Sequence, residues 1–175
     1  MSNITVKKIG ITDLDTDCIV NAANNELREG SGVCGAIFRA AGSEAMTEAC
    51  QKIRKEQGSV ITGFAVITPG FNLKAKYVIH AVGPVYARQS TNELAAGALY
   101  SAYKESLDLA RDNGCHSIGF PLISTGVFGY PKAEAWPIGI KACTEWLNAN
   151  RDWDMDIVFA VIDDETYEMG QMLLM

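Results

Sequence analysis

Two glycine-rich segments carry the residue types and spacing that could bind an anion. In the first, residues 24–35, Gly30, Gly32 and Gly35 surround the expected start of a helix. The second is residues 122–131, which end in Tyr130-Pro131. Glycine lets a phosphate approach the backbone, and a helix N-terminus adds free N–H groups and a favourable dipole. Two such loops at one edge of a sheet could hold a diphosphate between them, although the spacing alone is equally typical of tight turns.

Other phosphate and metal motifs are missing from the sequence. No G-x-x-x-x-G-K-[ST] occurs, and no G-x-G-x-x-G follows the first expected strand, so neither an NTPase nor a dinucleotide-dependent dehydrogenase is indicated. Five scattered cysteines without a C-x-x-C pair argue against a disulfide framework and a structural zinc site. They are Cys18, Cys34, Cys50, Cys115 and Cys143. We expect no metal and no cofactor.

The composition indicates a single globular domain and disfavours nucleic-acid polymers and membranes as partners. A net charge of −6 without a lysine or arginine cluster disfavours a nucleic-acid polymer as partner. Backbone amides could still hold an anionic ligand, since they need no net positive charge. With 48% hydrophobic and 21% charged residues, the chain fits one globular domain, 1–175. No apolar run approaches the ~20 residues of a membrane helix, and the N-terminus is expected to be a strand. We therefore expect a cytoplasmic protein without membrane contact, with a monomer as the default.

Strands and helices are expected to alternate along the chain. A Ser90-Thr91-Asn92-Glu93 capping box should open one helix, which Gly114 stops. Another helix should begin at Pro131 and kink or restart at Pro137. The remaining expected elements are strands 4–9, 18–23, 64–68, 77–82, 117–121 and 155–162, helices 33–41 and 43–57, and a short C-terminal helix. This order predicts a largely parallel sheet with helices on both faces and ligands at the carboxyl ends of the strands.

Four blocks of sequence resemble the macrodomain family in order and spacing. They read Ile19-Val20-Asn21-Ala22-Ala23-Asn24, then residues 30–42 (GSGVCGAIFRAAG), residues 80–86 (HAVGPVY) and residues 121–131 (PLISTGVFGYP). The likeness runs from about Val6 to Asp163 and is greatest to the bacterial mono-ADP-ribosyl and O-acetyl-ADP-ribose hydrolases. It implies an α/β fold, a three-layer α/β/α sandwich with a mixed, mostly parallel central sheet, and a cleft for ADP-ribose.

The resemblance also implies roles for individual residues. Asn24 would contact the distal ribose beside the reacting C1″ carbon, and Asn24 and Cys34 are the candidate catalytic residues. Asn21 and His80 are expected to be structural. The residues implied to bind the ligand are Ile11, Ala22, Gly32, Val33, Ser124, Thr125, Gly126, Val127, Phe128 and Tyr130. For Phe128 and Tyr130 the competing interpretation is that they are core aromatics.

The sequence departs from the family pattern at three positions. Cys34 stands where hydrolytic members carry an aspartate; it would pack as a small residue or, lowered in pKa by the helix N-terminus, act as a thiolate. Losing a general base typically costs ~10²–10⁴-fold in rate, so hydrolysis would be slow rather than absent. Gly10 replaces the adenine-contacting aspartate, with Asp13 nearby as a substitute. Ile162 stands where an aromatic residue often stacks on adenine.

Two functions from different classes remain open. One is an enzyme that hydrolyses ADP-ribosyl esters, on acidic protein side chains or in O-acetyl-ADP-ribose, by attack of water. The other is a non-catalytic module that binds ADP-ribose or a related nucleotide, which Cys34 favours. Binding of RNA or poly(ADP-ribose) is disfavoured by the acidic charge.

Overall fold

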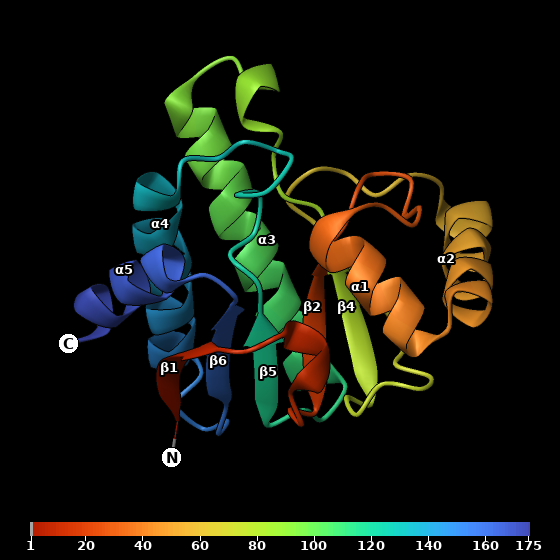
Figure 1. Cartoon of the computed structure of the whole chain (residues 1–175), viewed down its shortest axis with the longest axis horizontal. Coiled ribbons are helices and arrows are strands. Elements are labelled where there is room, and N and C mark those ends of the chain that lie inside the picture. The colour runs from red at the N-terminus through yellow and green to blue at the C-terminus, as the bar shows by residue number, and fades with distance from the viewer. Residues whose placement is uncertain (1) are drawn as a thin grey trace.

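The computed structural model describes residues 2–175 and has one sheet of six strands. The sheet lies between helices (Figure 1). The strand order is β1-β6-β5-β2-β4-β3, and only β3 runs antiparallel to its neighbour. The strands are β1 (Asn3–Lys8), β2 (Cys18–Ala22), β3 (Ala65–Pro69), β4 (Tyr77–Ala81), β5 (Ser117–Phe120) and β6 (Asp156–Val161). This mixed, mostly parallel sheet confirms the expected fold class.

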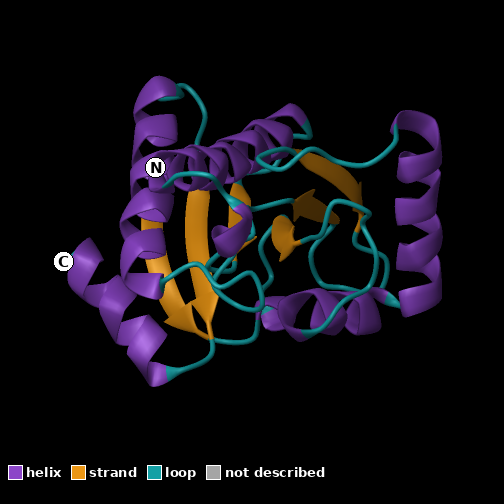
Figure 2. Ribbon diagram, turned by 90° about the horizontal axis from the view of Figure 1, so that it is seen from above, coloured by secondary structure: helices purple, strands orange, loops and turns teal. Residues whose placement is uncertain are grey.

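Helices cover both faces of the sheet, as Figure 2 shows from above. One face is covered by α1 (Gly32–Ala41) and α2 (Ser43–Gln57), the other by α3 (Asn92–Asp112) and α4 (Lys132–Ala149). The last helix, α5 (Asp164–Leu174), contacts β1 and α4. Short 3-10 turns, η1 (Ile11–Asp13) and η2 (Tyr86–Arg88), lie at the start of two connections.

The alternation of side chains along each strand divides the core into two clusters. On β2, Val20 faces α3 and α4, whereas Ile19 faces α1. On β4, Ile79 and Val78 divide in the same way. Both faces of a central parallel strand are covered, which is why these strands are mostly apolar, with Asn21 and His80 as the buried polar residues among them.

Two local expectations about helix starts and breaks are wrong. The cap of α3 is Thr91, whose Oγ1 accepts the Leu94 N–H at 3.1 Å, and not Ser90. Helix α4 begins one residue after Pro131 and continues through Pro137, so the expected restart there is wrong. Trp136 explains the continuity, because it is fully buried and its Nε1 donates to the Thr166 carbonyl at 3.1 Å. This packing holds the first turns of α4 in place despite the missing proline N–H.

No helix in residues 2–175 combines the length and the apolar character that crossing a membrane requires.

Candidate active site

Two loops meet at the edge of the sheet where β2, β4 and β5 end (Figures 1 and 2). We call residues 24–31, between β2 and α1, loop one, and residues 121–131, between β5 and α4, loop two. Loop two is also joined to the segment after β4, because the Tyr86 N–H donates to the Phe128 carbonyl at 2.9 Å. The predicted residues of the two loops and of the start of α1 are thus brought to one edge of the sheet, whereas Ile11 follows β1.

Loop two offers unpaired donors beside open space. Within residues 2–175, the amide hydrogens of Gly126, Val127 and Phe128 have no acceptor. A side chain added at Gly126 or Gly129 would meet no protein atom within 4 Å in the described chain. Val127 is 87% exposed, and Phe128 is half-buried. Free amides around empty space are what an anion such as a phosphate requires.

The start of α1 also has backbone N–H groups beside open space. Ser31 is its N-cap residue, yet the serine side chain makes no capping hydrogen bond. The first N–H groups of a helix lack intrahelical partners, so this end of α1 remains able to bind an anion. Gly32 is exposed, with open space around its α-carbon within the described chain, and Val33 is half-buried.

Two of the predicted ligand-binding side chains in loop two are turned inward. Ser124 is buried, and its Oγ points at Gly83 so closely that a β-carbon there would lie 2.2 Å away. Ser124 can therefore reach a ligand only through its backbone. Tyr130 is 3% exposed and packs edge-on against Tyr86 with ring centroids 4.8 Å apart, which is the core arrangement. Thr125 is half-buried and donates to the Leu122 carbonyl at 2.7 Å.

In loop one, the Asn24 side chain is held by the backbone of Arg28. The Arg28 N–H donates to Asn24 Oδ1 at 2.9 Å, and Asn24 Nδ2 donates to the Arg28 carbonyl at 2.9 Å. Sequence reasoning missed Arg28, and its i, i+4 spacing from an asparagine in a loop was the only available signal. Ala22 is half-buried at the end of β2, and the Ile11 side chain is buried in the core below.

Cys34 is a buried thiol in a chain of polar groups. Its Sγ donates to the Arg28 carbonyl at 3.6 Å and accepts from Asn21 Nδ2 at 3.6 Å. Burial raises the pKa of Cys34 above its ordinary value, so the thiol is protonated at neutral pH. Burial and the hydrogen bond that Cys34 donates to Arg28 favour the packing interpretation of Cys34 over a thiolate.

Asn21 and His80 extend this series of hydrogen-bonded polar groups beneath the site, and both are expected to be structural residues. Asn21 Nδ2 contacts His80 Nδ1 at 3.1 Å, and His80 Nε2 lies 2.9 Å from Thr68 Oγ1. Complete burial lowers the pKa of His80 to about 4, so its ring is neutral. An asparagine NH₂ can only donate, hence Nδ1 accepts and Nε2 carries the hydrogen. Within residues 2–175, Asn21 Oδ1 has no partner.

The region around Gly10 differs from the two loops. The Asp13 Oδ2 lies 3.2 Å from the position that a β-carbon on Gly10 would take, so this carboxylate stands beside the space that glycine leaves. Ile9 donates to the Val161 carbonyl at 2.9 Å, which brings Gly10 close to Ile162 at the ends of two paired strands. Ile162 is 80% exposed.

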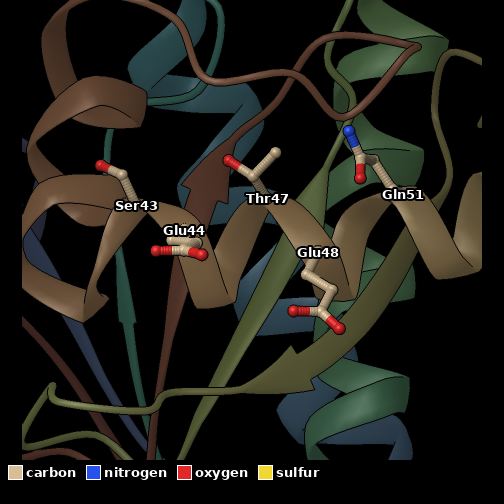
Figure 3. A pocket seen from close by; sticks show the side chains of 5 residues that line it. All are labelled: Ser43, Glu44, Thr47, Glu48 and Gln51. Carbon is tan, nitrogen blue, oxygen red and sulfur yellow. The ribbon is translucent and has the colours of Figure 1, made fainter.

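A separate hollow of about 480 Å³ lies along α2, and no residue of loop one or loop two lines it (Figure 3). All its lining residues come from that one helix, and they are Ser43, Glu44, Thr47, Glu48 and Gln51. Two carboxylates and no cation line it, so it is unsuited to a diphosphate. Within the described residues, no three His, Cys, Asp or Glu side chains gather as metal ligands.

Both the sequence and the structure are similar to those of known proteins. The family model described as Macro domain matches residues 20–139. A protein named O-acetyl-ADP-ribose deacetylase from Escherichia fergusonii is 47% identical over 173 residues, which cover 99% of this chain and 96% of that protein. A solved structure of an Oceanobacillus iheyensis macrodomain with ADP has a TM-score of 0.88 and 36% identity, covering 95% of this chain and 87% of the other. A Trypanosoma brucei macrodomain in complex with ADP-ribose has a TM-score of 0.87 and 34% identity, covering 98% and 69%.

Proposed function

Because the chain belongs to the macrodomain family, we propose that it binds ADP-ribose between its two loops and hydrolyses ADP-ribosyl esters. The observation that carries the proposal is the set of unpaired amides of Gly126, Val127 and Phe128 beside open space, opposite an uncapped helix start. Relatives named as O-acetyl-ADP-ribose deacetylases and a relative with bound ADP-ribose support the substrate class.

In this proposal the chain's own groups bind, orient and stabilise charge. The diphosphate accepts from the amides of loop two and of the first turn of α1. Asn24 contacts the distal ribose, and water attacks C1″ or the acyl carbon while loop-two amides stabilise developing negative charge. Cys34 supplies no base, since it is a protonated thiol. Asp13 is proposed to accept a hydrogen bond from the base in place of a side chain at Gly10.

The binding half of the proposal is tested by calorimetric titration with ADP-ribose. Gly126→Glu places a carboxylate in the open space of loop two, and like-charge contact should weaken binding more than about 100-fold. Gly126→Ala is the matched control, because a methyl group there meets no protein atom within 4 Å in the described chain. Binding by the glutamate variant equal to that of the alanine variant would place the ligand elsewhere.

The alternative is a module that binds ADP-ribose without turnover, favoured by the thiol at Cys34. Turnover of O-acetyl-ADP-ribose and of a mono-ADP-ribosylated acidic peptide separates the two functions. Under the enzyme proposal, the wild type is active and Cys34→Asp raises kcat toward the ~10²–10⁴-fold that a general base contributes. A wild type that binds product but leaves both substrates intact is a binding module.

We also infer a reducing compartment such as the cytoplasm, since all five cysteines are unpaired and buried.

A further inference from the structure

The amide of Asn24 is oriented by its neighbours before any ligand arrives. Arg28 N–H can only donate and the Arg28 carbonyl can only accept, so their two 2.9 Å bonds fix which end of the amide is oxygen. One N–H and one oxygen lone pair of Asn24 remain unused in this arrangement. Asn24 is half-buried at this point of loop one.

The Arg28 carbonyl receives a second donor, the thiol of Cys34 at 3.6 Å. Cys34 is itself fixed, because it is 6% exposed on the first turn of α1 and accepts from Asn21 Nδ2. Gly35 lets loop one lie tightly on α1, since a β-carbon there would be 2.5 Å from the Gly30 carbonyl oxygen. The backbone that orients Asn24 is thus held against α1 at Arg28 and at Gly30.

We propose that Cys34 is a positioning residue, whose thiol holds the Arg28 carbonyl and thereby orients the free N–H and lone pair of Asn24 toward the ligand. It acts through Arg28 and Asn24 and makes no contact with the reacting atoms. This inference rests on the proposed function for the role of Asn24, but the contacts between Cys34, Arg28 and Asn24 exist in the free protein.

The proposal requires a hydrogen-bond donor at residue 34 for the Arg28 carbonyl. Three variants distinguish this hydrogen bond from the simple filling of space by the side chain. Cys34→Ala deletes the donor, and Cys34→Ser keeps one. Cys143→Ala is the matched control, because Cys143 is a fully buried cysteine of α4 in the other core cluster.

The first measurement is hydrogen exchange at the Arg28 amide in the free protein, which needs no ligand. We expect Cys34→Ala to speed exchange at Arg28 at least about threefold, the equilibrium equivalent of one weak hydrogen bond, with Cys34→Ser and Cys143→Ala near the wild type. Unchanged exchange in Cys34→Ala, or equal acceleration in Cys34→Ser, would overturn the proposal.

The second measurement is a double-mutant cycle on ADP-ribose binding with Asn24→Ala. Cys34→Ala should weaken binding about threefold to tenfold in the wild-type background and have no further effect once Asn24 is alanine. Independent, multiplying effects would overturn the route through Asn24. If the wild type does not bind ADP-ribose, the proposed function fails, while exchange at Arg28 still decides whether Cys34 holds loop one.

The third measurement is the pH dependence of kcat. A positioning thiol predicts no rise in kcat as pH passes through the thiol range above neutrality, and Cys34→Ser should retain most of the activity. A rise that follows thiol ionisation and vanishes in Cys34→Ser would identify a base and overturn the proposal.

Discussion

The two loops of the site reach similar positions by different means. Loop one is held by groups from distant parts of the chain. Arg54 Nη1 donates to the Glu26 carbonyl at 2.7 Å, Asn25 Nδ2 donates to the Val60 carbonyl at 2.8 Å, and the Val60 N–H donates to the Asn25 carbonyl at 2.8 Å. In loop two, the segment after Ser124 is folded by bonds within its own backbone, with Tyr130 N–H on the Ser124 carbonyl at 2.8 Å and Gly129 N–H on the Gly126 carbonyl at 3.0 Å. Contacts from outside the loop are the Tyr103 hydroxyl, which accepts from the Ile123 N–H at 3.0 Å, and the Tyr86 N–H on the Phe128 carbonyl.

The two loops therefore present different groups to a ligand. Loop two can present many free amides because its shape depends on local turns such as Gly129, whose φ is +73°. Loop one presents one oriented side chain, Asn24, and needs a network to hold it. We therefore expect loop one to be the more sensitive to changes far from the ligand, and the tip of loop two, residues 125–129, to be sensitive mainly to changes within itself.

The largest expected effect concerns the buried, hydrogen-bonded residues Asn21, His80 and Thr68 beneath loop one. The pKa of His80 is lowered to about 4 from its ordinary 6.5, so between these values only the unfolded chain binds the proton. Stability should fall as pH drops from 6.5 toward 4, by roughly 3 kcal/mol, and should not fall further from this cause below pH 4. Urea unfolding across this range measures it.

The control for the pH experiment is His116→Gln, because His116 is the only other histidine and is exposed. The fall in stability attributed to His80 should persist in this variant. In the same window, loop one should exchange its amide hydrogens faster before loop two does, since a protonated His80 loses the Nδ1 acceptor of Asn21. Stability that stays flat between pH 6.5 and 4.5 would contradict the dependence on His80.

A smaller effect is expected from adding one methyl group to each loop region. Gly35→Ala forces a β-carbon to within 2.5 Å of the Gly30 carbonyl oxygen, so it should cost about 2–3 kcal/mol through displaced backbone. Gly126→Ala enters open space and should cost under about 0.5 kcal/mol. Urea midpoints that move equally would remove the contrast between a loop packed on its helix and a loop left open.

The last pair of variants compares the loss of a hydrogen bond from a distant residue with the loss of one inside a loop. Arg54→Ala removes the donor to Glu26 and should cost about 1–2 kcal/mol, with faster amide exchange in loop one only. Thr125→Val removes the hydroxyl donor to Leu122 and should cost about 1 kcal/mol, with changes in loop two only. Chemical denaturation with residue-resolved exchange measures both; exchange that spreads to both loops would show them to be one cooperative unit.

The sequence by itself determined the elements and the region of the site. Apolar runs of strand length, each followed by a glycine-rich or polar segment, predicted a mostly parallel sheet and placed both loops at its carboxyl edge. These are local patterns, since each depends on residues within a few positions of one another. The quoted blocks then identified the macrodomain family, to which the chain belongs.

Only the tertiary structure decided which side chains are free to act. Ser124 and Tyr130 are turned inward by Gly83 and Tyr86, and the thiol of Cys34 meets the Arg28 carbonyl. Helix α4 continues through Pro137 because Trp136 is held by α5. Most of these contacts join residues distant in sequence or on different elements, and sequence periodicity shows which face of an element is buried but not which groups meet there.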